Sequence, residues 1–322
     1  MSSSYLPSSV QSILFSFRPC FTAPSFENFV ALVCGWILCP GVHTISRAIV
    51  SACAQGLADK GHSAYYRFLA RARWSVDEVG RTLFRLLVPF LPEQIEAAVD
   101  DTLCHRTGPQ IFGAGMHHDA ATSTYGGTGG RRASFAFGHN WVVLSVWVPL
   151  PWNPERGIAI PVLLRLYRSK KRCPKAQYKK RTKLAFEMLK LLESWLPEGR
   201  TVDLAGDAEY ACRTLLRKLP ATVVFTGPMT MNAALYAKPP QYTGRGRPRV
   251  KGRRLRSPKA RAQKGTWQER TLRLYGRDVT ILMQTWTCLW YTVTGARVLA
   301  AARKRGNMAA TERHVGRGRS QD

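Results

Sequence analysis

The chain has 322 residues, of which 45% are hydrophobic and 10% aromatic, so it can bury a core in one large or two moderate domains and is not a disordered basic tail. Its 48 Lys and Arg against 20 Asp and Glu give a net charge of +28, which predicts salt-sensitive attraction to phosphate backbones and makes nucleic acid the expected partner. The longest apolar stretch, Phe29–Pro40, is far short of the roughly 20 residues that a bilayer span requires, which disfavours a membrane role.

Targeting signals and cysteines point to the cytoplasm. Residues 2–17 lack the basic start and cleavage site of a signal peptide. The eight cysteines form no C-x-x-C pair, which argues against a zinc ribbon and a disulfide framework and suits a reduced compartment. We therefore expect a cytoplasmic protein, associated with the nucleoid if its partner is DNA.

Residues 1–90 predict a helical region. Apolar residues recur at spacings of three and four in Phe26–Leu38, Thr44–Leu57 and Val76–Val88, and Ser75 with Glu78 resembles a capping box. Between the last two helices lies a basic, aromatic stretch, Tyr65–Trp74. This region is either a small helical module that grips DNA or a bundle whose arginines are simply solvated, and the pattern leaves both interpretations open.

From about Leu91 the periodicity changes. It predicts, in chain order, strands at Ile95–Leu103, His139–Leu150 and Ile158–Tyr167, a helix at Ala176–Trp195, a strand at Thr201–Ala205, a helix at Glu209–Leu219 and a strand at Thr222–Thr226. The order β-β-β-α-β-α-β is that of a ribonuclease-H-like domain. The predicted fold class is therefore α/β, with a ribonuclease-H-like mixed sheet flanked by helices in 91–227 and a basic, β-rich insertion in 228–295.

Two acidic sites stand at the ends of the first and fourth of these strands. Asp100 and Asp101 belong to the first site, and Asp207 follows the fourth strand. Carboxylates converging from different strands can hold Mg²⁺, and two such ions about 3.5–4 Å apart relieve the charge repulsion that protects a phosphodiester. The structural alternative is that Asp207 caps a helix and Asp100-Asp101-Thr102 forms a turn.

The blocks around these acids resemble those of bacterial insertion-sequence transposases of the DDE superfamily. Asp100–Leu103, Gly108–Gly115 and His117–Asp119 look like the first catalytic block of that family, and Leu204–Tyr210 is similar to the second. The resemblance covers about residues 40–295.

It implies cutting and joining of double-stranded DNA at the ends of a mobile element by two-metal catalysis, with Mg²⁺ or Mn²⁺ as cofactor and a homodimer as the acting form. By the same match Asp101, which precedes the threonine, is the first catalytic and metal-binding acid and Asp207 is the second. Asp100 replaces Asp101 if the register differs by one residue.

The third carboxylate of that family normally lies on a late helix, in a pattern of Tyr, Arg, Glu and Lys on one face. No such pattern follows Asp207, where the remaining acids are Glu209, Glu269, Asp278, Glu312 and Asp322. Glu209 is too close to Asp207 to form an independent wall of the site. We therefore hypothesise a truncated or frameshifted transposase, inactive through loss of this acid, with residues 296–322 as a basic, disordered tail. A tail that evolved to bind DNA is the alternative.

Two basic runs are predicted to contact DNA. Arg165–Lys183 holds ten Lys and Arg, and Lys238–Lys264 holds eleven, neither with an acid. Arg245-Gly246-Arg247-Pro248-Arg249 resembles an AT-hook, which lies in a narrow minor groove. The residues expected at the DNA backbone are Lys170, Lys171, Arg172, Arg245, Arg247, Arg249, Lys251, Arg253 and Arg254. The alternative is a solvated loop, and for the whole chain a non-catalytic, basic nucleic-acid-binding protein.

His117-His118-Asp119 is a weaker candidate for a metal site. Adjacent residues of an extended segment point in opposite directions, so the two histidines are not expected to share an ion, and the sequence predicts a polar loop here.

The frameshift hypothesis makes a prediction about the gene. Translation of the other two reading frames beyond about codon 295 should yield a helix that carries Tyr, Arg, Glu and Lys on one face. If neither frame yields such a helix, the hypothesis fails.

Overall fold

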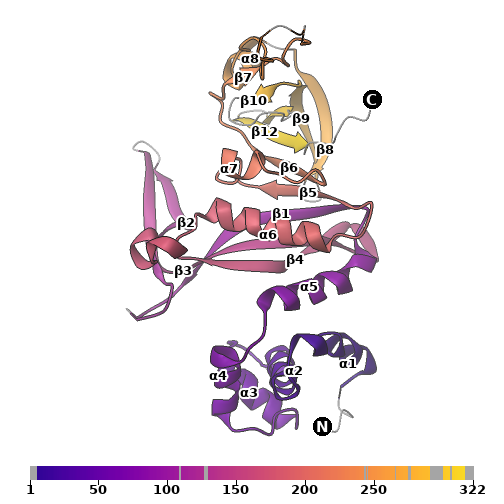
Figure 1. The fold of residues 1–322 in the computed structure, drawn as a ribbon, viewed down its shortest axis with the longest axis vertical. Coiled ribbons are helices and arrows are strands. Elements are labelled where there is room, and N and C mark those ends of the chain that lie inside the picture. The colour runs from indigo at the N-terminus through magenta and orange to yellow at the C-terminus, as the bar shows by residue number, and fades with distance from the viewer. Residues whose placement is uncertain are drawn as a thin grey trace. The chain divides into compact units, whose positions relative to one another are not determined.

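The computed structural model describes residues 6–108, 110–126, 130–242, 244, 246–264, 266–274, 277–290, 300–304 and 307–315. The chain divides into two compact units, Met1–Pro89 and Phe90–Asp322, which are drawn in Figure 1. Each unit is described by itself.

The first unit is helical, as the apolar spacing predicts. Its helices are α1 (Ser8–Phe15), α2 (Ala23–Leu38), α3 (Ile45–Ala54), α4 (His62–Arg71) and α5 (Val76–Leu87), with 3₁₀ turns at Arg18–Cys20 and Val88–Phe90. The hydroxyl of Ser75 accepts a hydrogen bond from the backbone N–H of Glu78, so the predicted cap of α5 is present. No helix among the described residues is long and apolar enough to cross a bilayer.

Aromatic side chains form the core of this unit. Phe21 stacks on Phe29 with ring centroids 4.7 Å apart, and Phe68 stacks on Trp74 at 5.7 Å. Tyr65 is also buried. Tyr65, Phe68 and Trp74 of the basic stretch therefore belong to the core, while its arginines and Tyr66 are exposed.

The second unit is built on a mixed sheet. Its elements are β1 (Gln94–His105), β2 (Gly115–Gly126), β3 (Gly130–Leu150), β4 (Asn153–Tyr167), α6 (Arg181–Trp195), β5 (Thr201–Gly206), α7 (Arg213–Leu216), β6 (Val223–Pro228), β7 (Leu235–Tyr236), α8 (Pro258–Lys264), β8 (Gln268–Leu274), β9 (Arg277–Thr285), β10 (Leu289–Trp290), β11 (Ala300–Lys304) and β12 (Asn307–Val315), with 3₁₀ turns at Lys170–Arg172 and Lys175–Gln177.

The strand order confirms the predicted ribonuclease-H-like fold. β3 pairs antiparallel with β1 and with β4, and β1, β5 and β6 are parallel neighbours, so the central order is β4-β3-β1-β5-β6. Parallel β1 and β5 need a crossover connection, and α6 lies within it. The carboxyl ends of β1 and β5 therefore lie at one edge of the sheet.

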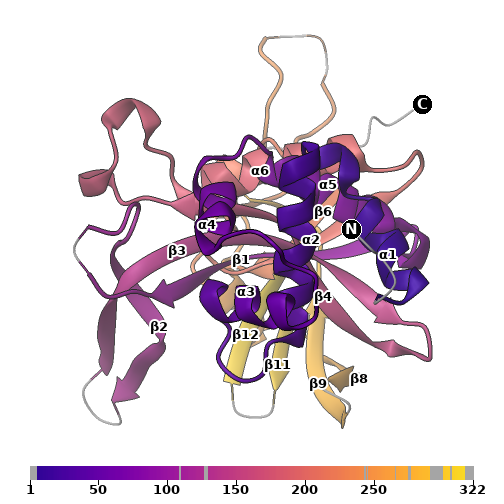
Figure 2. The ribbon, with the colours of Figure 1, turned by 90° about the horizontal axis from the view of Figure 1, so that it is seen from below.

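β2 is a strand that the sequence analysis misses. The sequence predicts three consecutive strands and a polar loop at His117–Asp119, and both predictions are wrong here. In chain order β2 comes between the two strands predicted first, β1 and β3, and it pairs antiparallel with the first half of β3. Gly138 pairs with Gly115 of β2 and with His105 of β1, so these two strands lie on opposite edges of β3. Figure 2 shows β2 and this half of β3 as a ribbon that extends away from the central strands.

α6 covers one face of the sheet. Burial in β1 alternates strictly, with Ile95, Ala97 and Val99 inside, and α6 contributes Met188 and Leu192 to the same core. The helix begins at Arg181 rather than at the predicted Ala176, because residues 175–177 form a 3₁₀ turn after Pro174. The helix predicted at Glu209–Leu219 is only the short α7.

The sheet continues beyond β6. β12 pairs antiparallel with β6, and the order then runs β12-β11-β9-β8. Two of these strands, β11 and β12, lie in residues 296–322, where the sequence analysis expects a disordered tail. Their pairing satisfies the backbone groups along the edges of β6 and β9.

Close packing of α2 on α3 makes a prediction about stability. A Cβ on Gly35 would collide with the backbone carbonyl of Ala48, which cannot move as a side chain can. Gly35→Ala should therefore lower the free energy of unfolding by about 1–3 kcal/mol, although alanine is normally the better helix former. The measurement is urea unfolding followed by far-UV circular dichroism.

Ile37→Ala is the control, because Ile37 lies in the same helix and is exposed. Its effect should stay within about 0.5 kcal/mol. Equal effects of the two substitutions would show that the α2–α3 contact is looser than described.

Candidate active site

The alternation of β1 places Asp101 and Asp100 on opposite faces of the sheet. Asp101 continues the row of Ile95, Ala97 and Val99, on the face that α6 covers, whereas Asp100 continues the exposed row. The parallel ladder between β1 and β5 ends at the pair Val99 and Gly206. Asp101 and Asp207 thus both follow the last paired residues, at the same edge.

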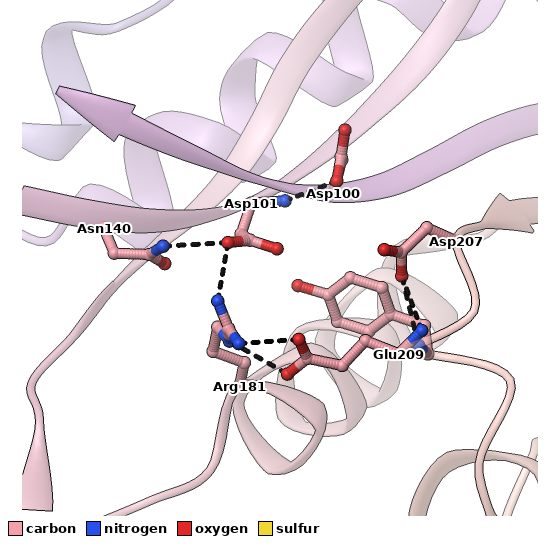
Figure 3. A network of polar contacts seen from close by, with 7 residues as sticks. Asp100, Asp101, Asn140, Arg181, Asp207 and Glu209 are labelled. Atoms are coloured by element: carbon pink, nitrogen blue, oxygen red, sulfur yellow. Dashed lines mark hydrogen bonds and ion pairs between the residues drawn. The ribbon is translucent and has the colours of Figure 1, made fainter. Parts of the chain in front are cut away.

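Asp101 is held by two donors from other elements. Its Oδ2 accepts hydrogen bonds from Nδ2 of Asn140 on β3 and from Nη1 of Arg181 on α6, both at 2.8 Å. Asn140 is 1% exposed, so this contact is fixed by the sheet. Figure 3 shows Asp101 directed toward Arg181 and Asp100 directed away from it.

Arg181 also binds Glu209, which makes it the centre of the cluster. Its Nε lies 2.9 Å from Oε1 of Glu209 and its Nη2 lies 2.6 Å from Oε2, a bidentate geometry. Burial alone would lower the pKa of Arg181, but the charges of Asp101 and Glu209 raise it above its ordinary value. The guanidinium is therefore permanently charged and links β1 to the turn after β5.

Asp207 shapes the turn that presents Glu209. Its Oδ1 accepts hydrogen bonds from the backbone N–H of Glu209 at 2.9 Å and of Tyr210 at 3.3 Å. Asp207 therefore closes a turn and does not cap a helix, because α7 begins at Arg213 with Cys212 as its N-cap. The second oxygen of the carboxylate stays available. Gly206 is required beside it, since a Cβ there would lie 2.8 Å from the buried ring of Phe225.

Negative charge exceeds positive charge in this cluster. Asp101, Asp207 and Glu209 carry three negative charges against the single positive charge of Arg181, which leaves two. Burial raises the pKa of Glu209 in spite of Arg181, and burial with the nearby carboxylates raises that of Tyr210. Burial is the largest cause of both shifts, and the charges of Asp101 and Asp207 add to them.

The donor chemistry suits a divalent cation. Carboxylate oxygens are the ligands that Mg²⁺ and Mn²⁺ prefer, and the two uncompensated charges match one such ion. Within the described part of the chain, no three His, Cys, Asp or Glu residues are grouped closely enough to form a ready-made metal site. Asp101 and Asp207 fit as ligands by type and by charge, with Arg181 as the cation that now balances Asp101.

The histidines of β2 do not join this cluster as metal ligands. Nε2 of His105 lies 2.9 Å from Oδ2 of the buried Asp119, so these two residues tie β1 to β2. His117 is buried and His118 exposed, as the alternation of a strand requires. Burial, together with the charge of Arg181, lowers the pKa of His117, so this side chain is neutral at pH 7.

The residues expected at DNA are exposed where the structure describes them. Lys170, Lys171 and Arg172 form a 3₁₀ turn, and the guanidinium of Arg172 lies over the ring of Phe137 at 5.2 Å. Arg245 lies outside the described residues. The remaining members, Arg247, Arg249, Lys251, Arg253 and Arg254, are all exposed.

A comparison with protein families identifies the chain. The family model of DDE superfamily endonucleases matches residues 16–294. The chain belongs to this family. None of the curated proteins compared with it matches. Membership in the DDE family agrees with the ribonuclease-H-like sheet, and the match ends near the point where the composition of the sequence changes.

Three residues of the cluster around Asp101 are not predicted as site residues from the sequence alone. Arg181 is one of ten basic residues in its run, and nothing local marks it as the one that binds acids. Asn140 lies in an apolar strand, where a polar residue in the buried row is a signal that could have found it. Glu209 is only two residues from Asp207, so the sequence does not suggest that it lines another side of the site. In the structure its carboxylate pairs with Arg181.

The network around Arg181 makes a prediction about stability. Arg181→Ala should lower the free energy of unfolding by about 2 kcal/mol in metal-free buffer, since hydrogen bonds to Asp101 and Glu209 are lost and the two carboxylates remain close together. The measurement is urea unfolding at low salt.

Lys183→Ala is the matched control, because it removes one charge from the same helix turn, its contact with Glu187 is 3.8 Å long, and Glu187 is paired more closely with Lys179, at 2.8 Å. We expect a change below about 0.5 kcal/mol. An effect of Arg181→Ala as small as that of the control would mean that the network contributes little to the fold.

Proposed function

We propose that this DDE-family protein is a DNA transposase that cuts and joins phosphodiester bonds at the ends of an insertion sequence. One observation carries the proposal: Asp101 from β1 and the Asp207–Glu209 turn after β5 face one space across Arg181 (Figure 3). Acids from two strands gathered at one edge, in a chain of net charge +28, suit a metal-assisted reaction on a polyanion.

Asp101 and Asp207 would hold the divalent ions. When bound, Mg²⁺ or Mn²⁺ would supply activation of the attacking oxygen and stabilisation of the leaving oxygen. The protein itself holds the two carboxylates in position. Asn140 fixes the rotamer of Asp101, and the backbone N–H groups of Glu209 and Tyr210 fix Asp207.

Arg181 has a second role in this proposal. Its guanidinium compensates Asp101 and Glu209 in the absence of metal, and its five N–H donors suit a phosphate oxygen equally well. A phosphodiester that enters the site would therefore meet a cation next to the acids, so repulsion between carboxylates and substrate is reduced.

The partner is taken to be double-stranded DNA. The exposed residues Lys170, Lys171 and Arg172 and the arginines after β7 support sequence-independent contact with its backbone. A homodimer, and association with the nucleoid in the cytoplasm, are part of the same proposal. Because no third acid is recognisable in the sequence, the proposal includes a truncated, inactive form of the transposase.

A non-catalytic nucleic-acid-binding protein is the second candidate. It is favoured by the fact that Asp207 already accepts two backbone hydrogen bonds in a turn and Asp101 already has an ion-pair partner. Under that function the acids are structural, and DNA binding is independent of divalent metal.

A nicking assay separates the two functions. Protein incubated with DNA that carries the element ends should nick it with Mg²⁺ or Mn²⁺, and Asp101→Asn or Asp207→Asn should reduce the rate at least about 100-fold, the loss expected when several kcal/mol of charge stabilisation disappears. Asparagine keeps the shape and, at 207, the oxygen that accepts from the backbone N–H groups of Glu209 and Tyr210.

Asp203→Asn is the control. Asp203 lies on β5, the strand that Asp207 follows, and it contacts Gln94 and Thr226, neither of which belongs to the cluster around Arg181. It should nick like the wild type. Metal-independent DNA binding without any nick would point to the second candidate or to an inactive transposase.

A further inference from the structure

A hollow in the region after β6 is lined by cations. It has a volume of about 420 Å³, and its polar lining consists of Arg253, Arg254, Arg256, Arg261, Lys264 and Gln284. Arg261 and Lys264 come from α8 and Gln284 from β9, both labelled in Figure 1. No acid among the described residues lines it, so five positive charges face one another without compensation.

Three buried N–H donors at or beside this hollow have no acceptor. They are Nε of Arg261, Nε2 of Gln284 and Nε1 of Trp286, none of which has a hydrogen-bond partner in the described part of the chain. Gln284 is only 9% exposed. Buried donors are rarely left unpaired in folded proteins, so a missing acceptor is indicated at this place.

The orientation of Arg261 is fixed. Its guanidinium lies over the ring of Trp286, 5.3 Å from the centroid. A stacked guanidinium cannot swing out to solvent freely, so its donors stay directed by the ring. The site therefore combines the buried donors of Arg261 and Gln284 with the exposed charges of Arg256 and Lys264.

We propose that this hollow binds backbone phosphates of DNA, as an anchoring site separate from the carboxylates of Asp101 and Asp207. Phosphate offers acceptors without donors and carries the charge that five cations require, whereas a water molecule would bring no charge. The inference rests on the proposed function, because that function supplies DNA as the source of the phosphate.

Salt-dependent DNA binding tests the site. The full chain is titrated against a 30-base-pair duplex in metal-free buffer, and the logarithm of Kd is plotted against that of the salt concentration. Arg256→Ala with Lys264→Ala should make the slope shallower by about 1.8, about 0.9 for each lost phosphate contact. Arg270→Ala with Arg277→Ala removes the same charge from exposed positions outside the hollow and should change the slope by less than half as much.

Gln284→Met separates hydrogen bonding from charge. It keeps the volume and removes the donor, so Kd should rise about 3- to 10-fold while the salt slope stays unchanged. Its urea midpoint is measured alongside, and the result counts for a variant that unfolds like the wild type. Equal slopes for the hollow pair and the control pair overturn the proposal.

A free polyphosphate is the other source of the same chemistry. If inorganic triphosphate raises the Tm of the wild type but not of Arg256→Ala with Lys264→Ala, and the DNA slope is unchanged, the hollow serves a free anion and the DNA assignment is overturned. The test is independent of cleavage. If the wild type nicks, Asp101→Asn does not, and the hollow pair binds DNA with an unchanged slope, only the phosphate site is refuted. If the hollow pair changes the slope and no protein nicks, the phosphate site stands and only an active transposase is refuted.

Discussion

The parallel pairing of β1 with β5 is the constraint on which the site depends. The ladder from Gln94–Thr201 to Val99–Gly206 fixes both strands in one direction and one register, so the acids that follow them come to the same edge. A slip of one residue would turn Asp101 to the face on which Asp100 now lies. The buried rows of the two strands and the cover of α6 prevent that slip.

The molecule combines a large positive net charge with one local cluster of carboxylates. The chain as a whole has 48 Lys and Arg against 20 Asp and Glu, while Asp101 and Glu209 both pair with the single guanidinium of Arg181 beside Asp207. Such a distribution attracts a polyanion over long range and leaves one place for cations at short range. Arg181 makes the two compatible, because it holds the acids together until another cation is present.

Regular elements with strong periodicity could be predicted from the sequence. The change of periodicity near Leu91 predicts β1 and α6, and the candidates Asp101 and Asp207 follow from the predicted strand ends. β2 could not, because its sequence is polar and shows no alternation of apolar and polar residues, and it pairs with β3 as a strand all the same. The role of Arg181 could not either, since it depends on a contact with Asp101 across 80 residues of chain.

Direct titration with Mn²⁺ in a calorimeter tests whether these carboxylates form a metal site. Wild-type protein should bind the ion, Asp101→Asn and Asp207→Asn should each lose that binding, and Arg181→Ala should bind more tightly because the competing guanidinium is gone. Equal Mn²⁺ affinity in all four proteins, or no binding in any, would contradict a metal role for Asp101 and Asp207.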